Sequence, residues 1–299
     1  MKFEGYRILV QMANRLGPWV FNLAARTIAV GYFLFSRRTG ESRRFYAVLF
    51  PRKGCLYHRW CTFRQYQNFT TIHLDRLLAN QGRPVPFSVA GEERLTAAIA
   101  DSGAILLMSH LGNWEIAARL LMRQRRDLRL LLYMGVKEKE GVERTQKEEL
   151  RRAGVTIIGV DQGDSSPFAA VDGIRLLQAG GLVSMTGDML WRPDQRRLPV
   201  TFCGHRAYVP EAPFVFALVA GVPIYVFFAF RAGASRYRVV LSEALTVRAA
   251  SRAERGAAVA EAARRYAALL EEALRAHPFE WYHFDRFIHD PVDRQSPAG

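Results

Sequence analysis

The chain has 299 residues, 49% of them hydrophobic, which suffices to bury a substantial core in one domain with an appended helical region. Its 42 lysines and arginines against 28 aspartates and glutamates give a formal charge of +14, which favours a polyanionic partner: nucleic acid, anionic lipid or a phosphate-bearing cofactor. Aromatic residues beside arginines near the N-terminus argue against a disordered nucleic-acid tail, and three cysteines without metal-ligand spacing argue against a metal site and favour a reducing compartment.

Residues 1–83 form the first region, which is aromatic, rich in arginine and mainly helical in pattern. Breaks at Gly17-Pro18, Gly40 and Pro51 predict several short helices rather than strands. We expect this region to be a helical arm that associates with a membrane. It is continuous with the core that follows over residues 84–299, so that the two form one globular unit.

Within this arm, residues 18–35 (PWVFNLAARTIAVGYFLF) are nearly long enough to span a bilayer. Asn22 and Arg26 interrupt the stretch, and because a buried charge makes insertion costly, we favour contact with one face of the membrane over a clean span. Arg37 and Arg38 follow directly and suit an anionic cytoplasmic surface. The pattern predicts a protein that is peripheral or singly anchored.

From residue 84 onwards, short apolar runs alternate with helical patterns. The expected strands cover residues 104–108, 128–133, 155–160, 182–186, 223–230 and 237–241. The expected helices cover residues 92–100, 142–153, 168–178 and 253–276. Strands that alternate with helices predict an α/β core with a largely parallel sheet flanked by helices.

The most informative segment is ILLMSHLGNWEIAARL at residues 105–120, where an apolar strand runs into His110 and then into a helix that contains Glu115. On a continuous helix, five steps of about 100° would put these two side chains on different faces, so they can meet only if His110 lies in a turn. There the carboxylate would fix the imidazole tautomer, and the other ring nitrogen would take a proton from a hydroxyl or amine. Such a base allows direct attack on a thioester, without a serine or cysteine nucleophile.

Gly112 and Asn113 lie where this helix begins. Free backbone N–H groups at a helix N-terminus would stabilise a developing oxyanion or position a substrate phosphate. The alternative is that His110 and Glu115 merely cap the helix, and their spacing alone does not decide between the two interpretations.

The segment HLGNWE at residues 110–115 resembles the HxxxxD/E block of the lysophospholipid acyltransferase superfamily, specifically its bacterial lipid A lauroyl/myristoyl acyltransferase branch. Further blocks follow in the order of that family: AGEE at 90–93, TGD at 186–188, VTFCG at 200–204, VP at 209–210, PFEWY at 278–282 and RF at 286–287. The resemblance covers residues 90–291. Because the N-terminal span is weaker than is usual in that family, the chain resembles a divergent branch.

The resemblance implies an α/β fold in which His110 is the general base and Glu115 orients it. It also implies that Asp188 lies near the site, and the topology agrees, because Asp188 follows a strand-like run at an end where α/β sites commonly lie. We therefore expect Asp188, together with Gly112 and Asn113, to position the substrate or the oxyanion. The alternative for Asp188 is a loop aspartate that caps a neighbouring turn.

The family often carries an arginine-bearing block after its second strand, but this sequence has YMGVK at residues 133–137. Lys137 or Arg144 is the expected substitute as a contact for a donor or lipid phosphate. Arg192, in the basic loop beyond Asp188, is a third candidate, with a solvated charged face as the alternative.

The resemblance implies an acyltransferase that moves a fatty acyl chain from acyl carrier protein or coenzyme A to a lipid-like acceptor, at the cytoplasmic face of the bacterial inner membrane. No bound cofactor, metal or nucleic-acid partner is expected, because the reaction needs a base, oxyanion donors and an activated ester. The competing hypothesis is a non-catalytic module on an acyltransferase-like fold, whose basic arm binds membrane or nucleic acid.

Overall fold

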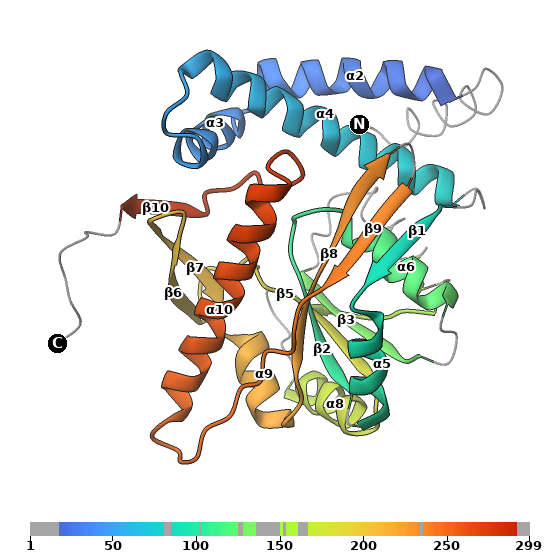
Figure 1. The fold of residues 1–299 in the computed structure, drawn as a ribbon, viewed down its shortest axis with the longest axis vertical. Helices are drawn as coiled ribbons and strands as arrows, with labels where there is room; N and C mark the ends of the chain where they lie inside the picture. The colour runs from blue at the N-terminus through green and yellow to red at the C-terminus, as the bar shows by residue number, and fades with distance from the viewer. Residues whose placement is uncertain are drawn as a thin grey trace.

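The computed structural model describes residues 18–80, 85–101, 103–124, 128–135, 150–151, 154–160, 167–233 and 236–291 (Figure 1). Its helices are α2 (Pro18–Phe35), α3 (Thr39–Leu49), α4 (Cys55–Asn80), α5 (Glu92–Asp101), α6 (Trp114–Gln124), α8 (Pro167–Gln178), α9 (Ala212–Ala220) and α10 (Arg255–Ala276). Its strands are β1 (Phe87–Ala90), β2 (Ala104–Met108), β3 (Leu130–Gly135), β4 (Thr156–Val160), β5 (Leu182–Thr186), β6 (Arg197–Phe202), β7 (His205–Pro210), β8 (Ile224–Gly233), β9 (Arg236–Leu241) and β10 (Ile288–Pro291).

Within the described residues, seven strands form a central sheet in the order β1-β9-β8-β2-β5-β3-β4. Strands β8, β2, β5, β3 and β4 are parallel to one another, whereas β9 runs antiparallel to β8 and pairs in parallel with β1. Strand β2 thus lies between β8 and β5, and all five of its residues are buried. Its carboxyl end therefore opens in the middle of the sheet edge, where ligands of α/β proteins commonly bind.

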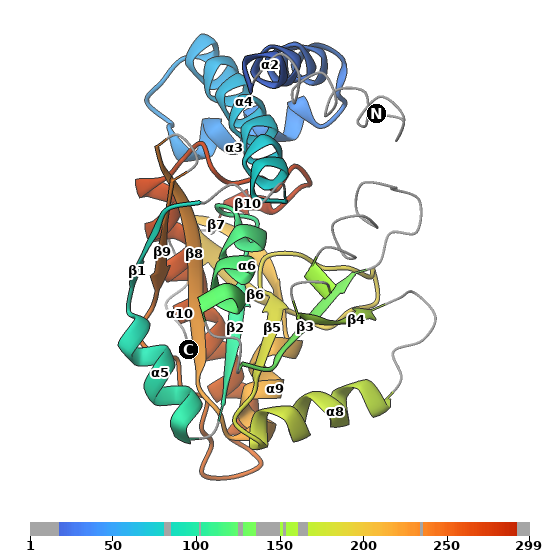
Figure 2. The same cartoon turned by 90° about the vertical axis from the view of Figure 1, so that its right-hand side faces the viewer.

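Alternate residues of β2 pack into two separate hydrophobic cores, one on each face of the sheet. Ile105 and Leu107 of β2 belong to the core with α9 and α10, whereas Leu106 and Met108 pack with the buried face of α6. Figure 2 shows the strands of the sheet spread across the view, with α6 in front of the sheet and α10 behind it. Successive side chains of a strand point to opposite faces of the sheet. Both faces are apolar here because helices cover each of them.

Helices α2, α3 and α4 lie together above the carboxyl end of β2, in the blue and cyan part of Figure 1. Aromatic contacts join α2 to α4: the ring centroids of Tyr32 and Tyr66 are 6.2 Å apart and those of Phe33 and Phe63 are 5.7 Å apart. Among the helices of the described residues, none combines the length and the apolar character that crossing a bilayer requires.

The predicted α/β fold with a largely parallel, helix-flanked sheet is confirmed. Each predicted strand matches β2, β3, β4, β5, β8 or β9 to within three residues, and the helices predicted at residues 92–100, 168–178 and 253–276 match α5, α8 and α10. Most of the helix predicted at 142–153 falls outside the described residues. The small sheet β10-β7-β6 and the helix α9 are elements that sequence periodicity missed.

Candidate functional site

The segment that links β2 to α6 is a turn held from two sides. The amide of Tyr282 donates to the carbonyl of His110 at 2.8 Å, and the amide of Gly112 donates to the carbonyl of Glu280 at 2.8 Å. On the other side, the amide of Asn113 donates to the carbonyl of Ala229, on β8, at 2.8 Å. His110 therefore lies in a turn between β2 and α6, and the turn is fixed by segments distant in sequence.

Gly112 is required by the close approach of this turn to β8. Its φ is +80°, in the left-handed region that favours glycine, and a Cβ placed there would lie 2.5 Å from the carbonyl oxygen of Ala229. A side chain at this position would therefore push the turn off the sheet.

The carboxylate that holds His110 is that of Asp188, which follows β5. Nδ1 of the His110 ring lies 2.9 Å from Oδ1 of Asp188, and the backbone amide of His110 donates to Oδ2 at 2.8 Å. The indole N–H of Trp281 donates to the same Oδ2 at 3.0 Å. Three N–H groups thus converge on one carboxylate whose side chain has no solvent exposure.

These donors keep Asp188 ionised. Burial by itself would raise the pKa of the carboxyl, but the charge and hydrogen bonds of His110 and the charge of His283 lower it to about 2. Because a carboxylate only accepts hydrogen bonds, Nδ1 of His110 carries the proton, and Nε2 of the neutral ring keeps its lone pair. With 23% of its side chain exposed, His110 offers this nitrogen as a base.

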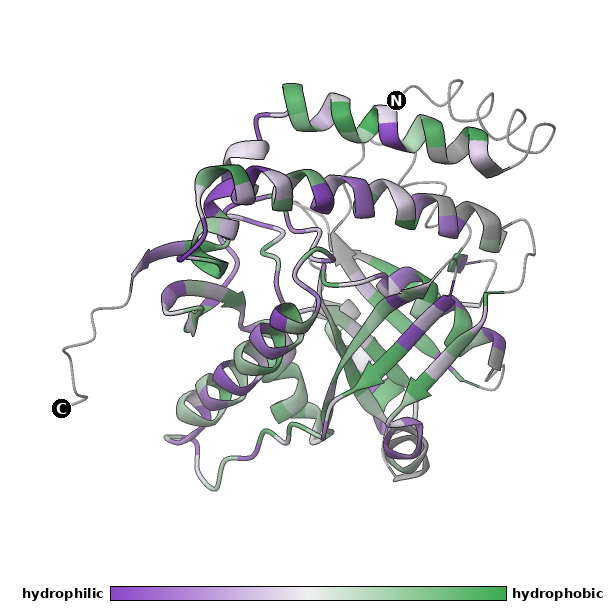
Figure 3. Ribbon diagram, turned by 45° about the horizontal axis from the view of Figure 1, so that its top comes forward, coloured by the Kyte–Doolittle hydropathy of each residue, from purple (hydrophilic) through white to green (hydrophobic). Residues whose placement is uncertain are grey.

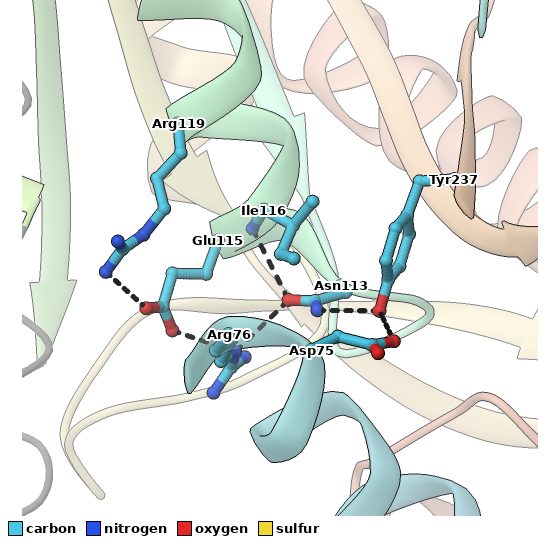
Figure 4. Close-up of polar contacts among 7 residues, drawn as sticks. All are labelled: Asp75, Arg76, Asn113, Glu115, Ile116, Arg119 and Tyr237. Atoms are coloured by element: carbon cyan, nitrogen blue, oxygen red, sulfur yellow. Dashed lines mark hydrogen bonds and ion pairs between the residues drawn. The ribbon is translucent and has the colours of Figure 1, made fainter. Parts of the chain in front are cut away.

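The expected contact between His110 and Glu115 is wrong. Oε2 of Glu115 lies 3.1 Å from Nε of Arg76, on α4, and Oε1 lies 3.3 Å from a terminal nitrogen of Arg119, one turn further along α6 (Figure 4). Glu115 is only 2% exposed. Glu115 lies in the first turn of α6, and Figure 4 shows its carboxylate reaching Arg76 of α4 and Arg119 of its own helix.

Asn113 links the Glu115 cluster to the sheet through hydrogen bonds to Arg76 and Tyr237. Its side-chain oxygen accepts from Nε of Arg76 at 3.2 Å and from the amide of Ile116 at 3.4 Å, so it caps α6. Its side-chain nitrogen donates to the Tyr237 hydroxyl at 3.2 Å, and that hydroxyl donates to Asp75 at 2.7 Å. Figure 4 shows these groups as one chain from α4 through α6 to β9.

The expectation that the amides of Gly112 and Asn113 are free to bind an oxyanion is also wrong. Both donate to backbone carbonyls, those of Glu280 and Ala229 respectively. Asn113 is fully buried, so its side chain does not reach a substrate either. The two residues position the turn and have no free donor to offer.

Of the three residues expected to contact a phosphate, the structure describes only Arg192. Lys137 and Arg144 lie outside the described residues. Arg192 lies in the loop beyond Asp188, as expected, and its guanidinium pairs with Asp194. Within the described part of the chain, no three histidine, cysteine, aspartate or glutamate side chains come together as a metal site would require.

An apolar cavity lies between α6 and the sheet. It encloses about 730 Å³ of empty space, part of it open to solvent. Its walls include Leu106 of β2, Phe227 of β8 and, on α6, Trp114, Ala117 and Ala118. Among the described residues that line it, Glu92 and Ser184 are the polar ones. The helix that follows the His110 turn therefore forms one wall of a space suited to an apolar ligand.

A family model described as bacterial lipid A biosynthesis acyltransferase matches residues 47–288 of the chain. The matched range includes Glu115 and Asp188 as well as His110 and Trp281. A comparison with curated proteins found no match.

Sequence reasoning missed the structural parts played by Arg76, Trp281 and His283. Arg76 gives no signal in the sequence, because it lies on a helix assigned to the membrane arm and reaches α6 only in the fold. Trp281 lies in the terminal block PFEWY and His283 follows that block directly, but the sequence assigned no contact to either residue. The structure places the Trp281 indole against Asp188 and the His283 ring against His110.

Proposed function

Since the chain belongs to the bacterial lipid A biosynthesis acyltransferase family, we propose that it moves a fatty acyl chain from a thioester, carried by acyl carrier protein or coenzyme A, to a hydroxyl or amine of a lipid-like acceptor. The observation that carries this proposal is the pairing of His110 with Asp188 at the carboxyl end of β2. It is the arrangement of an oriented general base, and no serine or cysteine nucleophile is needed beside it.

In the proposed reaction, Nε2 of His110 removes the proton of the acceptor hydroxyl or amine as its oxygen or nitrogen bonds to the thioester carbonyl carbon. Asp188 stabilises the imidazolium that forms, because its charge lies 2.9 Å from Nδ1. When the tetrahedral intermediate collapses, the carbon–sulfur bond breaks and the imidazolium returns its proton to the leaving thiolate. The acyl chain ends on the acceptor, and His110 is neutral again.

The apolar cavity supports a fatty acyl group as the transferred chain. Its wall on α6 starts at Trp114, four residues after His110, so the cavity lies beside the helix into which the His110 turn leads. Ala117 and Ala118 leave room because their side chains are small. A long apolar chain would gain about 0.8 kcal/mol per buried methylene there, which favours a fatty acid over a polar acyl group.

The outer surface of α2 supports a location at the cytoplasmic face of the inner membrane. Trp19, Leu23, Val30 and Leu34 recur at helical spacing and are between 42% and 61% exposed, and Figure 3 shows hydrophobic residues along this helix. Arg26 is exposed within this stripe, and the exposed basic residues that follow α2 in the chain include Arg37, Arg38, Arg43, Arg44, Arg52, Lys53 and Arg59. An apolar stripe with a basic surround fits an anionic lipid surface, on which α2 would lie in the plane of the interface.

The experiment that tests the proposed reaction is thioester consumption with dodecanoyl-acyl carrier protein and dodecanoyl-coenzyme A, against a bacterial lipid extract, with product identification by mass spectrometry. We expect acylated lipid from the unmodified protein and none above background from His110→Ala. The matched control is His205→Phe, a histidine on β7 whose Nδ1 faces the carbonyl of Cys203 in its own hairpin. Turnover by His110→Ala equal to that of the unmodified protein, or no turnover with either donor, would count against the proposal and favour a non-catalytic membrane-binding module.

A further inference from the structure

Trp191 lies beside the His110 ring, three residues after Asp188 in the chain. The centroids of the Trp191 and His110 rings are 6.4 Å apart, and the ring planes are tilted by 51°. The His283 ring lies edge to face with the same imidazole, at 5.7 Å. Two aromatic rings therefore border the proposed base, whose side chain remains 23% exposed.

The turn that carries Trp191 is closed by contacts of its own. The backbone amide of Trp191 donates to the side-chain oxygen of Gln195 at 2.9 Å, and the amide of Gln195 donates to the carbonyl of Arg192 at 3.2 Å. The guanidinium of Arg192 also pairs with Asp194. These contacts fix the backbone from which the indole reaches His110.

The two rings beside His110 differ in exposure and in polarity. His283 is buried, and its Nδ1 lies 3.1 Å from the backbone carbonyl of Asp285, so it belongs to the packed interior. Trp191 is half-buried, so part of its indole faces solvent next to the base. A tryptophan in this position places a large apolar surface where water would otherwise approach the imidazole.

A base that removes a proton from an acceptor hydroxyl can also remove one from water. In that side reaction the water oxygen bonds to the thioester carbonyl carbon, the carbon–sulfur bond breaks, and His110 passes the proton to the leaving thiolate. The products are a free fatty acid and a thiol. Because water is far more concentrated than any lipid acceptor, efficient transfer requires that water be kept from the base.

We propose that the Trp191 indole shields His110 from water and thereby directs the thioester to the acceptor rather than to hydrolysis. This inference rests on the proposed acyl transfer and names a residue that determines its specificity. The indole neither gives nor takes a proton in the reaction. Its removal therefore changes which nucleophile uses the base, and the base itself stays in place.

The first test measures how the dodecanoyl thioesters are divided between free dodecanoate and acylated lipid, with the bacterial lipid extract as acceptor. We expect Trp191→Ala to raise the ratio of free dodecanoate to acylated lipid at least about fivefold, and Trp191→Phe, which keeps an apolar ring, to stay within about twofold of the unmodified protein. Adding His110→Ala to Trp191→Ala should abolish the extra hydrolysis, because water uses the same base. The matched control is Trp60→Ala, at a tryptophan on α4 that is 46% exposed, and it should leave the ratio unchanged.

The second test needs no turnover. Diethyl pyrocarbonate acylates neutral imidazole nitrogens, and mass spectrometry measures its rate at each histidine. We expect Trp191→Ala to raise the rate of modification of His110 at least about threefold, because the ring is more open to solvent. His205, on β7, is the internal reference and should react at the same rate in both proteins.

An unchanged product ratio or an unchanged modification rate of His110 in Trp191→Ala would overturn the inference. Loss of transfer without a gain in hydrolysis or in modification would also overturn it, because the indole would then serve to bind a substrate. Failure of the proposed function is distinguishable. In that case the unmodified protein makes no acylated lipid, whereas the modification rates still report whether Trp191 encloses His110.

Discussion

Two buried carboxylates flank the turn between β2 and α6, and their partners differ in kind. Asp188 accepts from the His110 ring, the His110 amide and the Trp281 indole. Glu115 is enclosed by the guanidinium groups of Arg76 and Arg119, whose side chains are 13% and 12% exposed. One carboxylate thus contacts a group that can change its protonation state, and the other contacts groups that stay charged. On this difference we base the proposal that Asp188 serves the chemistry and that Glu115 holds the structure.

The Glu115 cluster also connects the N-terminal helices to the site. Helix α4 carries Arg76, and further along it Gln65 and Asn68 donate to the carbonyls of Trp281 and Phe279, at 2.5 Å and 3.1 Å. Asp75 of the same helix accepts from Arg231 and Tyr237 on the sheet. Helix α4 therefore contacts α6, the sheet and the segment that holds His110, so a shift of the arm would be transmitted to the turn.

The largest effect should come from Asp188→Asn, which keeps the size of the side chain but loses its charge. Because the imidazolium formed during transfer would no longer be stabilised and the tautomer no longer fixed, we expect turnover of the thioester to fall about a thousandfold or more. Steady-state rates on samples with matched circular dichroism spectra measure this. A loss of less than about tenfold would remove the distinction between the two carboxylates.

Glu115→Gln should act mainly on stability. It removes the buried charge that the guanidinium groups of Arg76 and Arg119 contact, and we expect a loss of roughly 3–5 kcal/mol in the free energy of unfolding. The triple variant Glu115→Leu, Arg76→Met, Arg119→Met contains no unpaired charge at this place and should recover most of that loss. Urea unfolding followed by circular dichroism compares the two proteins, and equal destabilisation of both would show that charge pairing is not what Glu115 provides.

The free energy of unfolding should depend on acid pH differently in the unmodified protein and in Asp188→Asn. The folded-state pKa of Asp188 is lowered from 3.8 to about 2, so its stabilising contribution is fully present above pH 4 and is lost as the pH falls toward 2. The shift corresponds to about 2 kcal/mol. We expect this part of the acid dependence of unfolding to disappear in Asp188→Asn, and identical slopes between pH 4 and pH 2 in both proteins would contradict the assignment.

Trp281→Phe should give the smallest effect, because it removes one of three donors to Asp188 and keeps an aromatic ring in the core. One neutral donor to a buried carboxylate accounts for a loss of about three- to tenfold in turnover. The control is Trp60→Phe, a Trp on α4 that packs on Phe279 at 5.3 Å and is 46% exposed. If both variants behaved alike, the indole N–H would have no specific part.

The local part of this site was predictable from sequence, and the long-range part was not. The apolar run before His110 and the helical pattern after it gave the strand, the turn and α6, because these depend on neighbouring residues. The partner of His110 lies 78 residues away, and the partner of Asn113 on α4 lies 37 residues away. Glu115 was the nearest carboxylate in the sequence, but proximity along a chain does not place two side chains on the same face.

The same reason explains the error at Gly112 and Asn113. A helix N-terminus offers free amides only if no other segment uses them, and here β8 and the segment of Glu280 do. The β6-β7 hairpin escaped notice because its strands carry Pro199 and Pro210, which disfavour a strand assignment, although apolar residues alternate along β6.

The most direct test of the central claim, that Asp188 and not Glu115 fixes the His110 tautomer, is nitrogen NMR of the histidine rings, with His110 assigned by its absence from His110→Ala. We predict a proton on Nδ1 and a bare Nε2 in the unmodified protein and in Glu115→Gln, and loss of that preference in Asp188→Asn. An unchanged tautomer in Asp188→Asn, or a tautomer that changes in Glu115→Gln alone, would contradict the account.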